Sequence, residues 1–477
     1  MKRTFPNILP LLLLTTLTAC SPTRREMPIT TSSEEARELY FEAQDIIENG
    51  WLADANELLY KAIEIDPDFV MAHTRLREYQ GIEKAKELSH KASPGEQMFI
   101  RAREARSARD VPLSIKIIDS LVKMYPGDKH ILHKAATFCS KLEDKQARKY
   151  LKKAIRIDPY YGPGHNLLGY LYMRTGRPRK AEKAFLKYLD LNPDDSNAID
   201  SYAEMLLDMG RIEEAIRQYD KVLYINPAFP DPSVKIALSY IWLGEFDRAR
   251  EYSNRLFEKG LVPLDKKKAV LMLANIEYIQ GNLQKTFDIL DENSKHLNIN
   301  EEDDDYVDLL YVIYYKGWYA TMAGDEELAI RIINEGLDTA SEHESWDAYN
   351  FINFPINGLL SFVFGVLGME EESLKYLIKA REIFDRLEKK SSPTLMRGFE
   401  SSYDLLTGNY QAAIERFPFV YDRRYVTAPF FLARAHEMAG NIDKAIENYT
   451  IVSQSFNPFY SGIFYRESLR KIEELSE

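Results

Sequence analysis

Residues 160–193 read YYGPGHNLLGYLYMRTGRPRKAEKAFLKYLDLNP, and this stretch of 34 residues decides the fold because its pattern recurs along the chain. Each copy ends in a short apolar phrase that is closed by a proline. The phrases are AIEIDP, LVKMYP, AIRIDP, YLDLNP and VLYINP. The successive prolines from Pro126 to Pro227 stand 33, 34 and 34 residues apart. Such regular self-similarity indicates stacked copies of one structural unit.

The sizes of the residues inside this stretch predict a pair of packed helices. Gly169 and Ala181 stand where the two helices approach most closely, so only small side chains fit there. Phe185 fills the space towards the next unit. Gly176 can adopt the left-handed conformation that ends a helix. Pro193 stands past the second helix, where no backbone donor is needed.

The combination of period, small positions and terminal proline resembles the tetratricopeptide repeat (TPR). The resemblance implies an all-α fold, a right-handed α-solenoid of about eleven TPR-like helix pairs with a shortened unit at 70–92. Ser93 and Glu96 form a capping-box pattern at one helix start. The charged final stretch, residues 460–475, is typical of a C-terminal capping helix that shields the last apolar face of an array.

The first twenty residues have the layout of a secretory signal: two positive residues, a short apolar run, and small residues directly before Cys20. This layout resembles a bacterial lipobox, which implies a signal peptide at 1–19 and lipid attachment at Cys20. An ordinary signal peptide with a chance cysteine is the alternative. Ser21, in place of an aspartate, implies the outer membrane more than the inner membrane. Residues 20–32 are predicted to form a lipid-anchored tether.

A run of five carboxylates, from Glu301 to Asp305, interrupts the repeats. Like charges in a row repel one another and disfavour the interior of a packed helix. The sequence therefore predicts an N-terminal TPR superhelix at 33–296, an acidic linker at 297–306, and a C-terminal degenerate TPR-like array with the capping helix at 307–477. A calcium loop is the alternative for the acidic run, but the run lacks the ligand spacing and the glycine of such a loop.

The sequence offers no catalytic site. It contains no glycine-rich phosphate loop, GxSxG elbow or HExxH motif, and no non-repeating stretch remains for a catalytic domain. His130 and His133 share a helix face, but no further ligand follows at helical spacing, so packing or surface roles are favoured over a zinc site. Cys139 is predicted to be a buried thiol. We expect a chain that is not an enzyme and uses neither cofactor nor metal.

The resemblance also indicates which residues face a ligand, because the first helix of each TPR pair lines a concave groove. The groove residues carried over to this chain are Asn166, Tyr170, Arg174, Asn197, Asp200, Glu204, Trp242, Tyr311, Tyr314 and Trp318. Aromatic and amide side chains of this kind suit an extended peptide. For the three aromatic residues from position 311 onwards, packing between repeats is the alternative.

These features predict a non-catalytic protein-interaction scaffold that is anchored by lipid to the cell envelope. An envelope protein or peptide would bind in its groove, in the service of envelope assembly or secretion. A binder of an exported polysaccharide is the alternative, which clustered exposed aromatic residues would favour. The net charge of −12, without a long basic cluster, argues against a nucleic-acid partner. The stretches PITTSSEEARELYFEA and NLLGYLYMRTG resemble bacterial TPR lipoproteins of undefined role.

Overall fold

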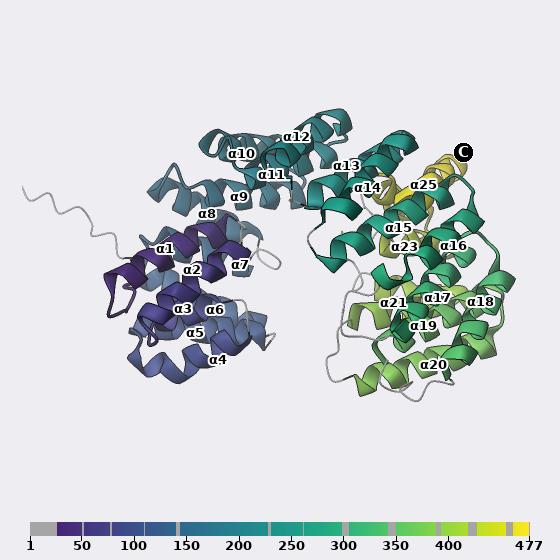
Figure 1. The fold of residues 1–477 in the computed structure, drawn as a ribbon, viewed down its shortest axis with the longest axis horizontal. Helices are drawn as coiled ribbons and strands as arrows, with labels where there is room; N and C mark the ends of the chain where they lie inside the picture. The colour runs from purple at the N-terminus through teal and green to yellow at the C-terminus, as the bar shows by residue number, and fades with distance from the viewer. Residues whose placement is uncertain are drawn as a thin grey trace, which may run out of the picture. The chain divides into compact units, whose positions relative to one another are not determined.

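The computed structural model describes most of the chain and shows helices stacked as consecutive pairs (Figure 1). Over the described residues the regular structure is α-helix with two short 3-10 helices and no strand, which confirms the predicted all-α fold of TPR-like pairs. The described residues are 26–49, 52–76, 79–108, 110–139, 144–227, 230–260, 262–297, 305–341, 350–387, 393–417, 427–454 and 461–476.

The chain divides into two compact units, of which unit 1 comprises Met1–Asn192. Its helices form five pairs, and the second pair is the shortened unit that the sequence predicts at 70–92. The pairs are α1 Glu34–Glu48 with α2 Leu52–Ile65, α3 Val70–Arg75 with α4 Tyr79–Glu87 and the 3-10 helix Leu88–Lys91, α5 Pro94–Ser107 with α6 Val111–Met124, α7 Lys129–Cys139 with α8 Asp144–Ile157, and α9 Gly162–Arg174 with α10 Pro178–Leu191.

Unit 2 comprises Pro193–Glu477 and ends in a single helix after its pairs. The pairs are α11 Ser196–Asp208 with α12 Ile212–Ile225, α13 Pro230–Leu243 with α14 Phe246–Lys259, α15 Pro263–Ile279 with α16 Leu283–Glu292 and the 3-10 helix Ser294–His296, α17 Asp305–Met322 with α18 Glu326–Ser341, α19 Asn350–Val366 with α20 Glu370–Arg386, α21 Pro393–Leu406 with α22 Tyr410–Arg416, and α23 Thr427–Met438 with α24 Ile442–Gln454; the last helix is α25 Ser461–Ser476.

A glycine in the left-handed conformation stands between the two helices of successive pairs. Gly176, for example, has a φ of 64° between α9 and α10, a conformation that costs other residues more than glycine. The same positive φ recurs at Gly210, Gly244, Gly281, Gly324, Gly368, Gly408 and Gly440. This series confirms the turn predicted from the repeat pattern and extends the frame through the whole of unit 2.

The segment before α1 lies along unit 1. The backbone nitrogen of Met27 donates to Asp128 at 3.0 Å, that of Thr30 donates to Glu96 at 2.8 Å, and that of Ser32 donates to Asp66 at 2.8 Å. These hydrogen bonds attach residues 27–32, which the sequence assigned to the tether, to the starts of three successive repeats. Only residues 21–26 then lie between Cys20 and Met27, the first residue that is hydrogen-bonded to the repeats.

The predicted cap of α5 is present, because Ser93 Oγ accepts from the backbone of Glu96, and the Glu96 carboxylate accepts from the backbone of Ser93. Glu96 therefore serves both the cap and the segment before α1. Among the described residues, none of the helices combines the length and the apolar character that crossing a bilayer requires.

In unit 2 one buried apolar cluster contains residues from before and after the predicted acidic linker. Leu271 and Leu290 precede that linker, Leu310 and Ile313 follow it, and all four belong to the same cluster. Residues 298–304 themselves lie outside the described residues, so the predicted segment boundaries stay a prediction.

Candidate functional site

The residues predicted to line a groove lie on the first helices of their pairs. Asn166, Tyr170 and Arg174 lie on α9 of unit 1, and the others lie on α11, α13 and α17 of unit 2. Most of them are half-buried; Asp200 is buried and Arg174 is exposed. Cys20, the predicted site of lipid attachment, lies outside the described residues.

In unit 2 the side chains of neighbouring first helices meet on one surface. The Nζ atom of Lys235 on α13 lies 3.3 Å from Asp200 and 3.7 Å from Glu204, both on α11. The same ammonium group lies 5.2 Å from the ring centroid of Tyr219 on α12. We call Asp200, Glu204 and Lys235 the polar wall. Its lysine neutralises part of the acidic character that the sequence alone suggests for this surface.

The aromatic residues predicted on α17, Tyr311, Tyr314 and Trp318, are half-buried and pack against the apolar cluster of unit 2. Lys267 on α15 places its Nζ atom 4.0 Å from the ring centroid of Tyr311, a cation–π contact between successive first helices. Burial lowers the pKa of Lys267 to about 8. These contacts match the packing alternative, and the groove assignment of the three residues stays a prediction.

The groove residues of unit 1 are tied to neighbours. The ring of Tyr170 stands edge-on to the buried ring of Phe185, with centroids 5.0 Å apart. Arg174 forms an ion pair with Asp144 of the preceding pair. The Oδ1 atom of Asn166 is buried and has no hydrogen-bond partner among the described residues.

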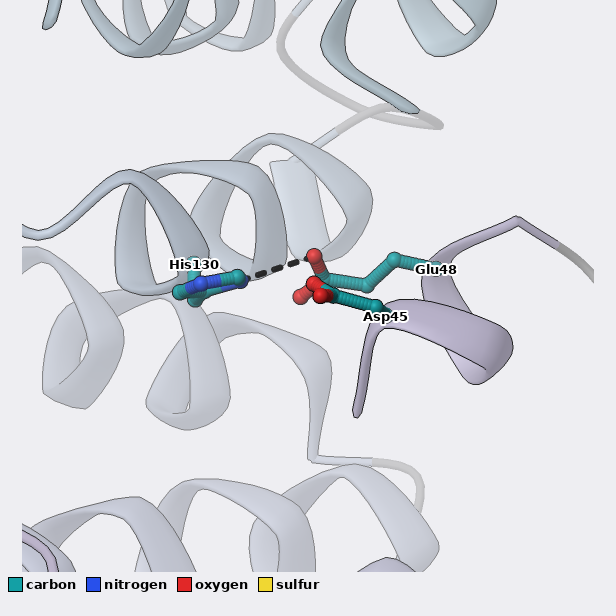
Figure 2. Close-up of side chains that lie close together, drawn as sticks. All are labelled: Asp45, Glu48 and His130. Atoms are coloured by element: carbon teal, nitrogen blue, oxygen red, sulfur yellow. Dashed lines mark hydrogen bonds and ion pairs between the residues drawn. The ribbon is translucent and has the colours of Figure 1, made fainter. Parts of the chain in front are cut away.

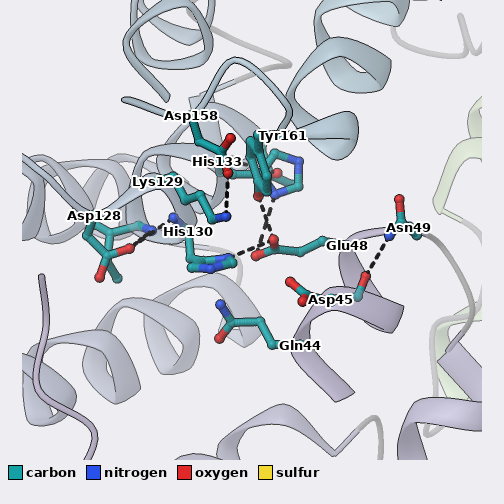
Figure 3. A network of polar contacts seen from close by, with 12 residues as sticks. Gln44, Asp45, Glu48, Asn49, Asp128, Lys129, His130, His133, Asp158 and Tyr161 are labelled. Atoms are coloured by element: carbon teal, nitrogen blue, oxygen red, sulfur yellow. Dashed lines mark hydrogen bonds and ion pairs between the residues drawn. The ribbon is translucent and has the colours of Figure 1, made fainter. Parts of the chain in front are cut away.

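Sequence reasoning missed a buried carboxylate network in unit 1, which centres on Glu48 at the end of α1 (Figure 3). His130 on α7 donates from Nδ1 to Glu48 Oε2 at 2.8 Å, and the hydroxyl group of Tyr161 donates to the same oxygen at 2.5 Å. Nδ1 of His133 lies 3.8 Å from Glu48 Oε1. The network therefore joins α1 to helices that start more than 80 residues later.

The surroundings of Glu48 shift several pKa values. Burial alone would raise the pKa of Glu48, but the hydrogen bond from His130 and the charges of the neighbouring imidazoles His130 and His133 outweigh it and hold that pKa well below its usual range. Burial lowers the pKa of His130, but the hydrogen bond to Glu48 and the charge of Glu48 raise it by more. The pKa of His130 is therefore raised overall. Burial and the neighbouring Glu48 raise the pKa of Tyr161 well above its usual value. Glu48 and His130 thus each favour the charged form of the other.

Asp45 joins Glu48 and His130 in a group whose ligand-type atoms lie within 4.8 Å of one another (Figure 2). Two carboxylates and one imidazole are ligands that a divalent metal could use. Here, however, the imidazole nitrogen and one carboxylate oxygen are already joined by a hydrogen bond, and Tyr161 occupies the same oxygen. The arrangement is a network of hydrogen bonds and ion pairs around Glu48, and the preference of the sequence for a packing or surface role of His130 over a zinc site stays a prediction.

A pocket of about 280 Å³ with a strongly basic lining lies beside this network. We call it the basic pocket; it is lined by Ile47, Arg75, Arg103, Arg106, Ser107, Lys134 and Phe138. Its four cationic residues come from the first helices α3, α5 and α7, and no carboxylate belongs to the lining. This is unusual in a chain whose net charge is −12.

Two of the four cations have neutral partners. Arg75 donates to Gln44 Oε1 at 2.9 Å, and Arg106 donates to the backbone oxygen of Phe138 at 3.4 Å. Of the residues that the structure describes, none forms an ion pair or a hydrogen bond with the side chain of Arg103 or Lys134. Burial, followed by the charges of Arg75 and Arg103, lowers the pKa of Lys134 to about 7. Burial and Arg75 lower the pKa of Arg103 to about 10.

Two family models match the chain, both described as tetratricopeptide repeat, over residues 145–204 and 198–229. Among curated proteins, the small glutamine-rich tetratricopeptide repeat-containing protein 2 of Saccharomyces cerevisiae is 30% identical over 102 residues, which cover 21% of this chain and 30% of that protein. The CTR9 homolog of Arabidopsis thaliana is 30% identical over 113 residues, covering 24% and 10%. The chain thus spans less than a third of the length of these relatives.

Solved structures that are similar to parts of the chain include three proteins of low sequence identity. One is a tetratricopeptide repeat protein from Parabacteroides merdae, with 16% identity, a TM-score of 0.35, and coverage of 59% of this chain and all of that chain. Another is PilW, described as a type IV pilus biogenesis factor, with 19% identity, a TM-score of 0.36, and coverage of 44% and 97%. YrrB, described as having an unusual peptide-binding site, has 17% identity, a TM-score of 0.28, and coverage of 42% and 91%.

Proposed function

Because tetratricopeptide repeats match residues 145–229 and the fold is a stack of such helix pairs, we propose that the chain is a non-catalytic interaction scaffold. It is anchored by lipid at Cys20 to the cell envelope and binds a segment of an envelope protein along its first helices. The polar wall of unit 2 is the observation that carries the binding part. There Lys235 reaches Asp200 and Glu204 of the neighbouring first helix, so successive repeats contribute charged groups to one surface. Such a surface supplies donors and acceptors to an extended backbone.

The proposed anchor gains support from the segment before α1. Met27 is already bonded to Asp128, so the chain between Cys20 and the first attached residue spans at most about 25 Å when fully extended. A lipid at Cys20 would therefore hold unit 1 close to the bilayer surface. By resemblance to bacterial lipoproteins, Ser21 directs the protein to the outer membrane more than to the inner membrane.

Replacing Cys20 with alanine tests the anchor. Since no other described segment can cross a bilayer, Cys20→Ala is expected to move the protein from the membrane fraction into the soluble fraction. The measurement is ultracentrifugation of broken cells followed by immunoblotting, with Cys139→Ala as the control that keeps the anchor. Sedimentation of Cys20→Ala with the membranes would contradict lipid anchoring at this residue.

Crosslinking from the polar wall tests the interaction. A photoreactive residue in place of Glu204, whose side chain is 41% exposed, is expected to capture a discrete protein in the native cells. Arg217 is the matched control, because it is exposed on α12, the second helix of the same pair. A band that appears from Glu204 and not from Arg217 would support the scaffold. Equal capture from both positions would contradict it. Capture from neither position would also contradict it and would favour the polysaccharide alternative.

A further inference from the structure

We propose that the basic pocket of unit 1 binds the phosphate group of a small phosphorylated molecule. The proposal goes beyond the scaffold function, since the polar wall belongs to unit 2 and the basic pocket to unit 1. It rests on the charge, the volume and the lining of the pocket, which are considered in turn below.

The positive charge of the pocket lining favours a ligand that carries more than one negative charge. Four cationic side chains face a pocket that has no carboxylate in its lining, and those of Arg103 and Lys134 have no ion-pair or hydrogen-bond partner among the described residues. A single carboxylate would leave most of this charge uncompensated. A phosphate group brings close to two negative charges and three strong acceptor oxygens at neutral pH.

The directions of the cations also suit phosphate. Arg75 comes from α3, Arg103 and Arg106 from α5, and Lys134 from α7, so donors reach the pocket from three helices. Guanidinium groups form paired hydrogen bonds with phosphate oxygens, and an ammonium group adds a point charge. A tetrahedral group can accept from several sides at once, whereas a carboxylate offers two oxygens in one plane.

The size of the pocket indicates a small ligand. Its volume of about 280 Å³ lies near the lower end of the range for small-molecule sites. Ile47 and Phe138 add apolar walls beside the cations, and these walls can hold a compact organic group that is attached to the phosphate. We therefore expect a phosphomonoester with a small apolar part.

The lowered pKa of Lys134 also supports the proposal. Burial and two neighbouring arginines, Arg75 and Arg103, lower the pKa of Lys134 to about 7, although Glu48 on α1 acts in the opposite direction. The lysine is therefore largely neutral at pH 8. A bound dianion would favour its charged form, so binding at pH 8 should be accompanied by proton uptake.

Isothermal titration calorimetry on the full-length chain provides the test, with phenyl phosphate as the ligand and benzoate as the carboxylate that carries the same ring. Phenyl phosphate is expected to bind at least about tenfold more tightly than benzoate, because benzoate has one negative charge and one acceptor oxygen fewer and so loses a charge-assisted hydrogen bond. It is also expected to bind more tightly than inorganic phosphate, which cannot use the apolar walls. No binding of phenyl phosphate, or binding of phenyl phosphate that is no tighter than that of benzoate or of inorganic phosphate, would overturn the proposal.

Lys134→Met provides the variant that keeps the fold. It removes a half-buried amine that becomes charged when the phosphate binds, and it keeps an unbranched side chain. The repeat should therefore remain folded, while the affinity for phenyl phosphate should fall about tenfold or more. Lys183→Met is the control, since Lys183 is exposed on α10. Titrations at pH 8 in buffers of different ionisation enthalpy should show proton uptake in the unsubstituted chain and in Lys183→Met, but not in Lys134→Met.

An equal loss of affinity in Lys134→Met and Lys183→Met would show a diffuse effect of net charge, and it would overturn the proposal. Proton uptake that persists in Lys134→Met would do the same. Neither result would bear on crosslinking from Glu204, so failure of the phosphate site and failure of the scaffold can be told apart.

Discussion

Replacing Gly169 with leucine is expected to lower the free energy of unfolding of unit 1 by about 3 kcal/mol. A Cβ atom at this position would lie 2.8 Å from three ring atoms of Phe185, and that ring is fully buried between α9 and α10. The ring also stands edge-on to Tyr170 on α9, so it cannot move away without disturbing that contact. Overpacking of this kind forces strained rotamers or shifts of the backbone.

The measurement is denaturant unfolding combined with hydrogen exchange of the amides in α9 and α10, because repeat arrays need not unfold in a single step. Gly176→Ala is the matched control within the same pair. Nothing lies within 4 Å of a Cβ at Gly176, so its cost should come from the positive φ alone and be about 1 kcal/mol. An unchanged stability of Gly169→Leu would show that the assigned repeat register is incorrect.

A double-mutant cycle identifies the cause. If the ring of Phe185 is what the new side chain meets, Phe185→Leu should reduce the cost of Gly169→Ala, because a smaller side chain leaves room for the added methyl group. Strictly additive effects would point instead to strain in the backbone of α9.

The helix pairs could be predicted from the sequence because the signals that specify them are local. Each pair needs small residues where its helices meet, a glycine between them and a proline after them, and these signals lie within one period. The roles of Gly176 and Phe185 can therefore be predicted from the sequence of one repeat alone. The capping box at Ser93 is equally local, since its partner stands three residues away.

The buried network and the basic pocket could not be predicted in the same way. Glu48 meets His130 across 82 residues, and Arg75 shares a pocket with Lys134 on a different helix pair. Such contacts between residues distant in sequence depend on the small rotation between successive repeats, and no short motif encodes that rotation. The available signal was the position of these residues on first helices.

Replacing Glu48 with glutamine is expected to lower the stability of unit 1 by about 2 kcal/mol near pH 5.5. The carboxylate side chain is only 4% exposed, accepts from His130 and Tyr161, and joins α1 to α7 and α9. Glutamine preserves the shape of the side chain but removes the charge that pairs with the imidazolium. The bonds between helices distant in sequence are therefore weakened without the creation of a cavity.

The pH dependence of this loss follows from the two pKa shifts. The pKa of Glu48 is lowered on folding, so its contribution is present above its unfolded value of about 4.3 and is lost as the pH falls through the folded value. The pKa of His130 is raised, so its contribution is complete below its unfolded value of about 6.5 and is lost as the pH rises through the folded value. The stability difference between the unsubstituted chain and Glu48→Gln should therefore be largest between about pH 4.5 and 6.5.

Urea unfolding of both proteins from pH 4 to 9 measures this difference, and hydrogen exchange in α7 locates it. Glu57→Gln serves as the control on α2, since Glu57 is an exposed residue paired with Lys61 one helical turn away, and no measurable change is expected from it. A difference for Glu48→Gln that is constant across this pH range would show that shape and hydrogen bonding, rather than the charge on His130, make the network stabilising. A maximum above pH 8 would contradict the raised pKa of the histidine, because a neutral imidazole gains nothing from a neighbouring carboxylate's charge.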